Sequence, residues 1–225
     1  MNYQQYILYH LQGDAGVEER LISKLKASLN LDDWGAFRLV YYYSTTYNIQ
    51  SALKLLENPD TDKKELKFRT DRRYVRIAGN YERMMKELNV GMLNRLKKCT
   101  TTTQAYEEVL SWFFFGRYAA FLFLECWLKC YPNTLVDDLK LKWEANENYT
   151  KGAEIVVGSK ERSRLDKFIE SAKRDTKDNV FSLETSLCAV EKIRKGTRWN
   201  GYYTERMLKE AYESKYATII YQLAT

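Results

Sequence analysis

The sequence predicts an all-α fold for its 225 residues. Proline occurs only twice and glycine ten times, while the strong helix formers Leu, Lys, Glu, Ala and Arg are frequent. Apolar residues recur at spacings of three and four, which is the period of a helix with one buried face. Because the chain shows no internal repeat, low-complexity tract or break in composition, we expect a single multi-helix globular domain over residues 1–225.

The first half of the chain contains five expected helices. In residues 14–29 an apolar stripe of Val17, Leu21, Ile22 and Leu25 marks a buried face. The next helix has Asp32 or Asp33 as a candidate N-cap, and the third is stopped by the Asn-Pro-Asp sequence at 58–60. The expected ranges are 14–29, 32–43, 48–57, 71–88 and 103–115.

The most apolar stretch, residues 111–128, reads "SWFFFGRYAAFLFLECWL". It is close to the length that spans a membrane, but Arg117 and Glu125 lie inside it. Each charge would cost roughly 2.5–3.5 kcal/mol at the centre of a bilayer. We therefore expect a buried central helix and no membrane partner.

Beyond Pro132 the pattern is more mixed. A short helix is expected up to Trp143, followed by a turn-rich loop over 146–152. The sequence "AEIVVG" at 153–158 is the one strand-like pattern, although it has no second strand with which to pair. Helices over 159–173, 181–195 and 202–223 are joined by the polar "RDTKDN" segment and the "GTRWNG" turn.

Composition limits the location and the chemistry of the protein. The four cysteines lack the spacing of a secreted disulfide framework, and no signal segment precedes residues 1–11, so we expect a reduced, cytoplasmic protein. His10 is the only histidine, so we expect no metal site. Phosphate-binding loops, dinucleotide-binding glycine motifs and serine-hydrolase or zinc-protease motifs do not occur, and the sequence indicates no required cofactor.

Positive charge is concentrated near the C-terminus. The net charge is +6, and residues 160–209 hold thirteen Lys and Arg against eight Asp and Glu. Such a local basic surface suits nucleic acid or another phosphate-bearing molecule, but a solvated helix face has the same composition.

One helix face in this region combines chemically useful side chains. Glu184, Cys188, Lys192 and Lys195 recur at helical spacing, and Tyr202, Arg206 and Lys209 repeat the pattern after the turn. One interpretation is an exposed Glu–Lys face with Cys188 packed beneath it. The other is a phosphate-binding wall with a tyrosine ring for a base.

Two further clusters are candidates. Arg117 lies among aromatic residues, where it must either pair or face a cavity, and Glu125 follows two turns later. These two residues either bridge to neighbouring helices or line one cleft. Arg72 and Arg73, in the sequence "DRRY", suit contacts with backbone phosphates and equally the start of an ordinary helix.

The stretches "FGRYAAFLFLE" (115–125) and "ETSLCAVEKIRKGTRWNGYYTER" (184–206) resemble the bacteriophage amino acid:DNA transferases, also called alpha-glutamyl/putrescinyl-thymine pyrophosphorylases. The resemblance covers about a third of the chain, mainly in its second half. It implies an enzyme that replaces the pyrophosphate of 5-pyrophosphoryloxymethyluracil in DNA with an amine, from an amino acid or a polyamine. It also implies a helical domain distantly like helical DNA glycosylases and, for a phage protein, the host cytoplasm.

On these motifs we assign roles as hypotheses. The resemblance favours the site wall over the solvent face, and it leaves open a divalent cation at the pyrophosphate. Cys188 either attacks C6 of the uracil as a thiolate or packs in the helix while the amine displaces pyrophosphate directly. The alternatives to a transferase are a non-catalytic helical DNA-binding or scaffold protein and a helical DNA glycosylase. The candidates are Glu125, Glu184 and Cys188 for catalysis; Arg72, Arg73, Arg117, Lys192, Lys195, Arg198 and Arg206 for phosphate and DNA; and Tyr118, Tyr202 and Tyr203 for base stacking.

Overall fold

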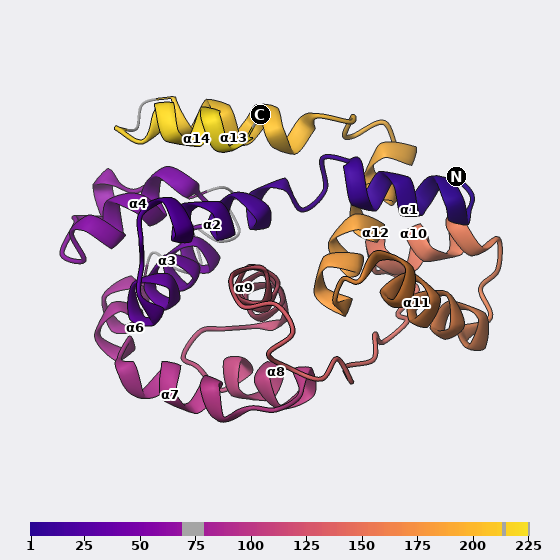
Figure 1. Cartoon of the computed structure of the whole chain (residues 1–225), viewed down its shortest axis with the longest axis horizontal. Coiled ribbons are helices and arrows are strands. Elements are labelled where there is room, and N and C mark those ends of the chain that lie inside the picture. The colour runs from indigo at the N-terminus through magenta and orange to yellow at the C-terminus, as the bar shows by residue number, and fades with distance from the viewer. Residues whose placement is uncertain (69–78, 213–214, 225) are drawn as a thin grey trace. The chain divides into compact units, whose positions relative to one another are not determined.

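A computed structural model describes residues 1–68, 79–212 and 215–224 of the chain, and it is built from α-helices (Figure 1). The all-α prediction is therefore confirmed. The chain divides into two compact units, each made of two separate stretches of sequence: residues 1–18 with 137–206, and residues 19–136 with 207–225. A single domain over the whole chain stays a prediction.

The first unit contains α1 (Tyr3–Gln12), α10 (Asn148–Val157), α11 (Arg162–Thr176) and α12 (Val180–Arg194). Two further helices contribute residues to both units, because a unit boundary falls within each of them. These are α2 (Val17–Ser28) and α13 (Tyr202–Ala211). The second unit contains α3 (Asp33–Thr46), α4 (Ile49–Glu57), the short 3₁₀ helix η1 (Lys63–Glu65), α6 (Tyr81–Glu87), α7 (Val90–Lys98), α8 (Thr102–Leu110), α9 (Arg117–Cys130) and α14 (Ala217–Ala224).

Aromatic rings form the core of the second unit, where α3 packs against α4 and α9. The ring of Phe37 on α3 lies 5.5 Å from the rings of both Trp112 and Phe123, and those two rings are 4.8 Å apart. All three pairs meet edge to face, the arrangement that the charge distribution of aromatic rings favours. The Asp32 carboxylate accepts a hydrogen bond from the amide of Gly35 at 2.7 Å, which confirms the predicted N-cap of α3.

The apolar stretch at 111–128 forms a buried helix as expected, but the helix begins only at Arg117. Residues 111–116 make a turn in which Phe114 takes the left-handed conformation, with φ of 69°. Gly116 then serves as the N-cap of α9. Of the helices in the part of the chain that the structure describes, none is both long enough and apolar enough to cross a bilayer.

Helices α10 and α12 approach each other very closely in the first unit. A Cβ atom placed on Gly152 of α10 would lie 2.1 Å from the carbonyl oxygen of Leu187 on α12. Real Cβ atoms do not come this near to a backbone atom, so only glycine allows the contact. The crossing of α10 and α12 therefore depends on one residue without a side chain.

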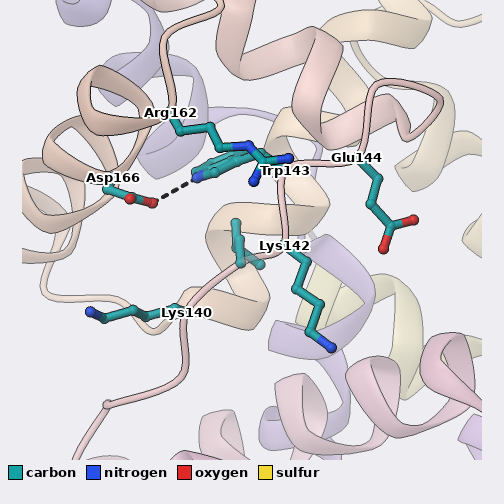
Figure 2. Close-up of a pocket in the computed structure, with 7 residues that line it drawn as sticks. Lys140, Lys142, Trp143, Glu144, Arg162 and Asp166 are labelled. Carbon is teal, nitrogen blue, oxygen red and sulfur yellow. Dashed lines mark hydrogen bonds between the residues drawn. The ribbon is translucent and has the colours of Figure 1, made fainter.

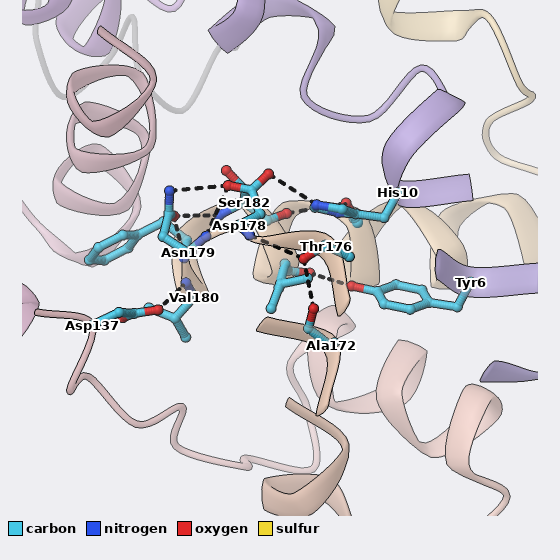
Figure 3. A network of polar contacts seen from close by, with 12 residues as sticks. Tyr6, His10, Asp137, Ala172, Thr176, Asp178, Asn179, Val180 and Ser182 are labelled. Carbon is cyan, nitrogen blue, oxygen red and sulfur yellow. Dashed lines mark hydrogen bonds and ion pairs between the residues drawn. The ribbon is translucent and has the colours of Figure 1, made fainter. Parts of the chain in front are cut away.

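A polar network ties α1 to α12 in the same unit (Figure 3). His10 Nδ1 lies 2.6 Å from the Ser186 hydroxyl, and His10 Nε2 lies 3.1 Å from the Asp178 carboxylate. The Tyr6 hydroxyl donates to the Leu183 carbonyl at 3.2 Å. Because Ser186 is buried and its hydroxyl donates to the carbonyl of Ser182, we interpret this Ser–His–Asp group as part of the core.

The strand predicted at 153–158 is wrong. These residues form the end of α10, and Gly158 ends the helix in the left-handed conformation with φ of 68°. Tyr149, Gly152, Ala153 and Val156 are buried at spacings of three and four, whereas Ile155 and Val157 are half-buried. Packing against α12 therefore outweighs the strand propensity of the β-branched residues.

Other boundaries also differ from the prediction. The helix expected over 103–115 ends at Leu110, and of the helix expected over 71–88 the structure describes α6 from Tyr81, while residues 71–78 lie outside the described part. The helix expected up to Trp143 is wrong, because residues 137–144 run without a helix and bury Leu141 and Trp143 in alternation with exposed lysines. The loop expected over 146–152 is largely helical, since α10 begins at Asn148. The helix expected over 202–223 consists of the two separate helices α13 and α14.

Candidate functional site

The predicted row on α12 runs from the core into solvent. Glu184 is buried, Cys188 and Lys192 are half-buried, and Lys195 is exposed just beyond the last helical residue. The Glu184 end of the row is thus enclosed by the protein, whereas the lysine end can contact a large ligand. Of these four residues, only Lys195 at the end of α12 is therefore exposed to solvent.

Glu191, which the sequence analysis did not single out, organises the basic end of α12. Arg194 donates to both of its carboxylate oxygens, at 2.8 and 3.0 Å, and the Lys195 ammonium lies 3.0 Å from Oε1. The hydrogen bonds from Arg194 are the main cause that lowers the pKa of the buried Glu191 carboxyl to about 2. The sequence contained a signal for these ion pairs, since Arg194 and Lys195 follow Glu191 by three and four residues. The pairing means that the Glu191 carboxylate partly compensates the charge of Lys195.

The turn after α12 brings four aromatic or basic side chains together. Gly196 and Gly201 take positive φ values of 67° and 97°, a conformation that other residues adopt only at a cost. The Arg198 guanidinium lies 3.9 Å from the centre of the Tyr202 ring and 5.2 Å from that of Tyr203. The predicted i, i+4 relation on α13 is also present, since Arg206 donates to the Tyr202 hydroxyl at 3.0 Å.

We call this group the basic-aromatic surface. It belongs to the first unit and joins the end of α12 to the start of α13. Its cations suit phosphates, and its rings suit bases. Its members are Lys192, Lys195, Arg198, Trp199, Tyr202, Tyr203 and Arg206.

Asp14, far away in the sequence, holds the start of α13 in place. Its buried carboxylate accepts hydrogen bonds from the amides of Tyr203 and Thr204 and from the Thr204 hydroxyl, the last two at 2.7 and 2.6 Å. These amides belong to the first turn of the helix, whose N–H groups have no partner within the helix itself. Asp14 therefore positions the basic-aromatic surface without belonging to it.

Replacing Asp14 by alanine should lower the free energy of unfolding by about 1–2 kcal/mol, because the first-turn amides of α13 lose their acceptor. Chemical denaturation followed by circular dichroism measures this change. Asp14→Asn keeps an acceptor and should recover part of the loss. Equal stability of the alanine variant and the wild type would show that α13 does not depend on this cap.

The candidates on α9 lie in the second unit. The Arg117 guanidinium is 4.6 Å from the centre of the Phe121 ring and 5.3 Å from that of Tyr118. Tyr118 is 62% exposed, whereas Glu125 is only 2% exposed. The candidates of 184–206 thus belong to one unit and those of 117–125 to the other, while Arg72 and Arg73 lie outside the described residues.

A pocket of about 430 Å³ in the first unit was not anticipated. It is lined by the buried Leu141 and Trp143 and by the charged residues Lys140, Lys142, Glu144, Arg162 and Asp166. Figure 2 shows the Trp143 ring with Asp166 and Arg162 beside it. The indole N–H of Trp143 donates to the Asp166 carboxylate at 2.7 Å, which fixes that acid at the pocket. Cations and carboxylates therefore border the same space.

Within residues 1–68, 79–212 and 215–224, no three His, Cys, Asp or Glu side chains are grouped so that they could hold a metal ion. Comparison of the chain with models of known protein families, with curated proteins and with solved structures finds no match. The resemblance described above thus stays a hypothesis, and the geometry has to support the function.

Proposed function

We propose that this protein is a DNA-modifying transferase that replaces the pyrophosphate of 5-pyrophosphoryloxymethyluracil in DNA with an amine. The observation that carries the proposal is the basic-aromatic surface, because DNA offers phosphates for its cations and bases for its rings. The same sequence, 184–206, carries most of the resemblance to the phage transferases.

In this reaction the amine nitrogen forms a bond to the 5-methylene carbon of the modified uracil. The bond from that carbon to the pyrophosphate oxygen breaks, and pyrophosphate leaves with the electron pair. We assign Lys192, Arg198 and Arg206 to the departing anion, whose developing charge they would stabilise. The role of Arg117, which belongs to the second unit, stays a prediction from the sequence.

The pocket at Trp143 supports a choice between the two classes of amine. A polyamine carries only positive charge and would meet Lys140, Lys142 and Arg162. An amino acid carries both signs, so its carboxylate suits the cations while its ammonium suits Asp166 and Glu144. The mixed lining of this pocket therefore suits an amino acid better than a polyamine.

The direct test supplies the purified protein with DNA that contains 5-pyrophosphoryloxymethyluracil, together with a pool of amino acids and polyamines. Digestion to nucleosides and mass spectrometry should reveal a heavier nucleoside, with release of pyrophosphate. Failure of every amine to give a new nucleoside would contradict the proposal. Abasic sites in its place would indicate a helical DNA glycosylase.

A second candidate is a non-catalytic DNA-binding protein. The Glu191 ion pairs with Arg194 and Lys195 favour it, because they are typical of an ordinary solvated helix end. This protein would bind DNA with an affinity that falls as salt rises, since bound phosphates release counterions. It would release no pyrophosphate, which separates it from the transferase.

The half-buried thiol of Cys188 favours direct displacement by the amine over a covalent enzyme adduct. We expect the Cys188→Ser variant to keep its activity within a few-fold of the wild type in the nucleoside assay. Loss of turnover with retained DNA binding, together with a DNA–protein adduct trapped only in the wild type, would contradict this expectation and support a thiolate nucleophile.

A further inference from the structure

Trp199 is the most accessible large ring of the basic-aromatic surface. It is 54% exposed, whereas Tyr202 and Tyr203 are half-buried. Tryptophan is highly buried on average in folded proteins, so an indole with more than half of its surface in water is unusual. The exposed apolar area of Trp199 lies in the middle of a cationic turn, between Arg198 and Tyr202.

The two tyrosine rings are already engaged within the cluster. Tyr202 has the Arg198 guanidinium over its ring at 3.9 Å, the Trp199 ring at 5.0 Å and the Tyr203 ring at 5.3 Å. Its hydroxyl accepts a hydrogen bond from Arg206. Tyr202 and Tyr203 are therefore half-buried and in contact with their neighbours, and Trp199 is the ring of this surface with the most area open to solvent.

We infer that Trp199 is the base-stacking residue of this surface and that it selects unpaired nucleotides over paired ones. In a duplex both faces of each base are covered by its neighbours, so an indole can stack only on a base that is single-stranded or extruded. The inference rests on the DNA binding that the proposed function requires, but not on the transfer reaction.

Stacking and charge contribute differently to binding. A stacked base contributes to affinity independently of the salt concentration, whereas each phosphate contact adds to the salt dependence. Trp199 carries no charge, so removing it should weaken binding without changing the slope of affinity against salt. Removing the charge of Lys192 or Lys195 should instead weaken binding and also reduce the slope of affinity against salt.

The test measures binding of fluorescein-labelled oligothymidylate and of a duplex with the same number of nucleotides, over a series of salt concentrations. Trp199→Ala should weaken binding of the single strand about 5- to 150-fold, in line with the loss of one stacked base. Binding of the duplex should change less than about threefold, a shift smaller than the loss of one stacked base. Trp199→Phe should restore much of the affinity, which shows that an aromatic ring is what matters.

Tyr212→Ala is the matched control, because Tyr212 is 74% exposed and lies outside the basic-aromatic surface. It should bind both probes as the wild type does. Fluorescence offers a second readout: the single strand should quench the emission of the wild type more than that of Trp199→Phe.

The outcomes separate this inference from the proposed function. If Lys192→Gln and Lys195→Gln weaken binding and reduce its salt dependence while Trp199→Ala leaves binding of the single strand unchanged, the DNA surface stands and the stacking role is wrong. Equal losses for single strand and duplex would overturn the selection of unpaired nucleotides. A wild-type protein that binds neither probe would contradict both proposals.

Discussion

Replacing Gly152 by alanine is expected to cost about 3 kcal/mol or more of the free energy of unfolding, at the upper end of what overpacking costs in protein cores. The added methyl group would lie 2.1 Å from the Leu187 carbonyl oxygen. Because this neighbour is backbone, no side chain can rotate away, and α10 and α12 would have to separate along a buried interface. The melting temperature of the first unit should fall by roughly 10 °C or more, as calorimetry would measure.

Two other glycines serve as controls for this substitution. Gly158 has open space around its Cα but a φ of 68°, so Gly158→Ala should show only the cost of the left-handed backbone, about 1 kcal/mol. At Gly116 there is open space and a negative φ, so alanine there should show only the modest preference for glycine over alanine at an N-cap, a cost well below that at Gly152. A Gly152→Ala variant as stable as Gly116→Ala would show that the close approach of α10 and α12 is wrong.

Local signals in the sequence predicted much of the fold. Asp32 precedes an apolar run and caps α3, and the apolar stretch at 111–128 contains the buried helix α9. The stretch at 153–158 was predicted wrongly because its composition favours a strand, whereas the close contact at Gly152 decides the outcome. That contact joins residues far apart in the sequence, and no local pattern contains it.

The same distinction applies to the candidate site. The relation of Tyr202 to Arg206 on α13, and that of Cys188 to Lys192 on α12, were visible because a helix places residues four apart on one face. Asp14 could not be linked to α13, since its partners Tyr203 and Thr204 lie 189 and 190 residues further along the chain. Trp199 belongs to the turn that the sequence predicted, but no sequence pattern distinguished it from Tyr202 and Tyr203 as a candidate for base stacking. Its larger exposed fraction in the structure does.

The candidate carboxylates differ in what surrounds them. Glu184 shares its unit, and its helix, with Lys192 of the basic-aromatic surface, whereas Glu125 belongs to α9 of the second unit. Both carboxylates are buried. Burying a carboxylate costs free energy, and residues buried at such a cost often belong to functional sites. Their roles in the proposed transfer can therefore be separated by substitution, one residue at a time.

The Glu184→Gln variant is expected to lower turnover by roughly 10²- to 10⁴-fold, the usual contribution of a general base. An amine is mostly protonated at neutral pH and must lose a proton before its nitrogen attacks the 5-methylene carbon, and we propose that the Glu184 carboxylate accepts this proton. Glutamine keeps the shape of the side chain but cannot take up a proton. Oligonucleotide binding should stay the same, so a rate measured in a single turnover with saturating enzyme isolates the effect.

Three further variants decide whether the effect is chemical. Glu205→Gln removes an equal charge from the exposed side of α13 and should react at the wild-type rate. Glu184→Asp keeps a carboxylate, so its single-turnover rate should still rise with pH as that carboxyl group ionises. This part of the pH dependence should be absent from Glu184→Gln. A merely structural glutamate would instead lower the melting temperature of the Gln variant and leave the pH profile of its remaining activity unchanged. If Glu184→Gln reacts like the wild type while Glu125→Gln is slow, the proton acceptor is Glu125 on α9 and not Glu184.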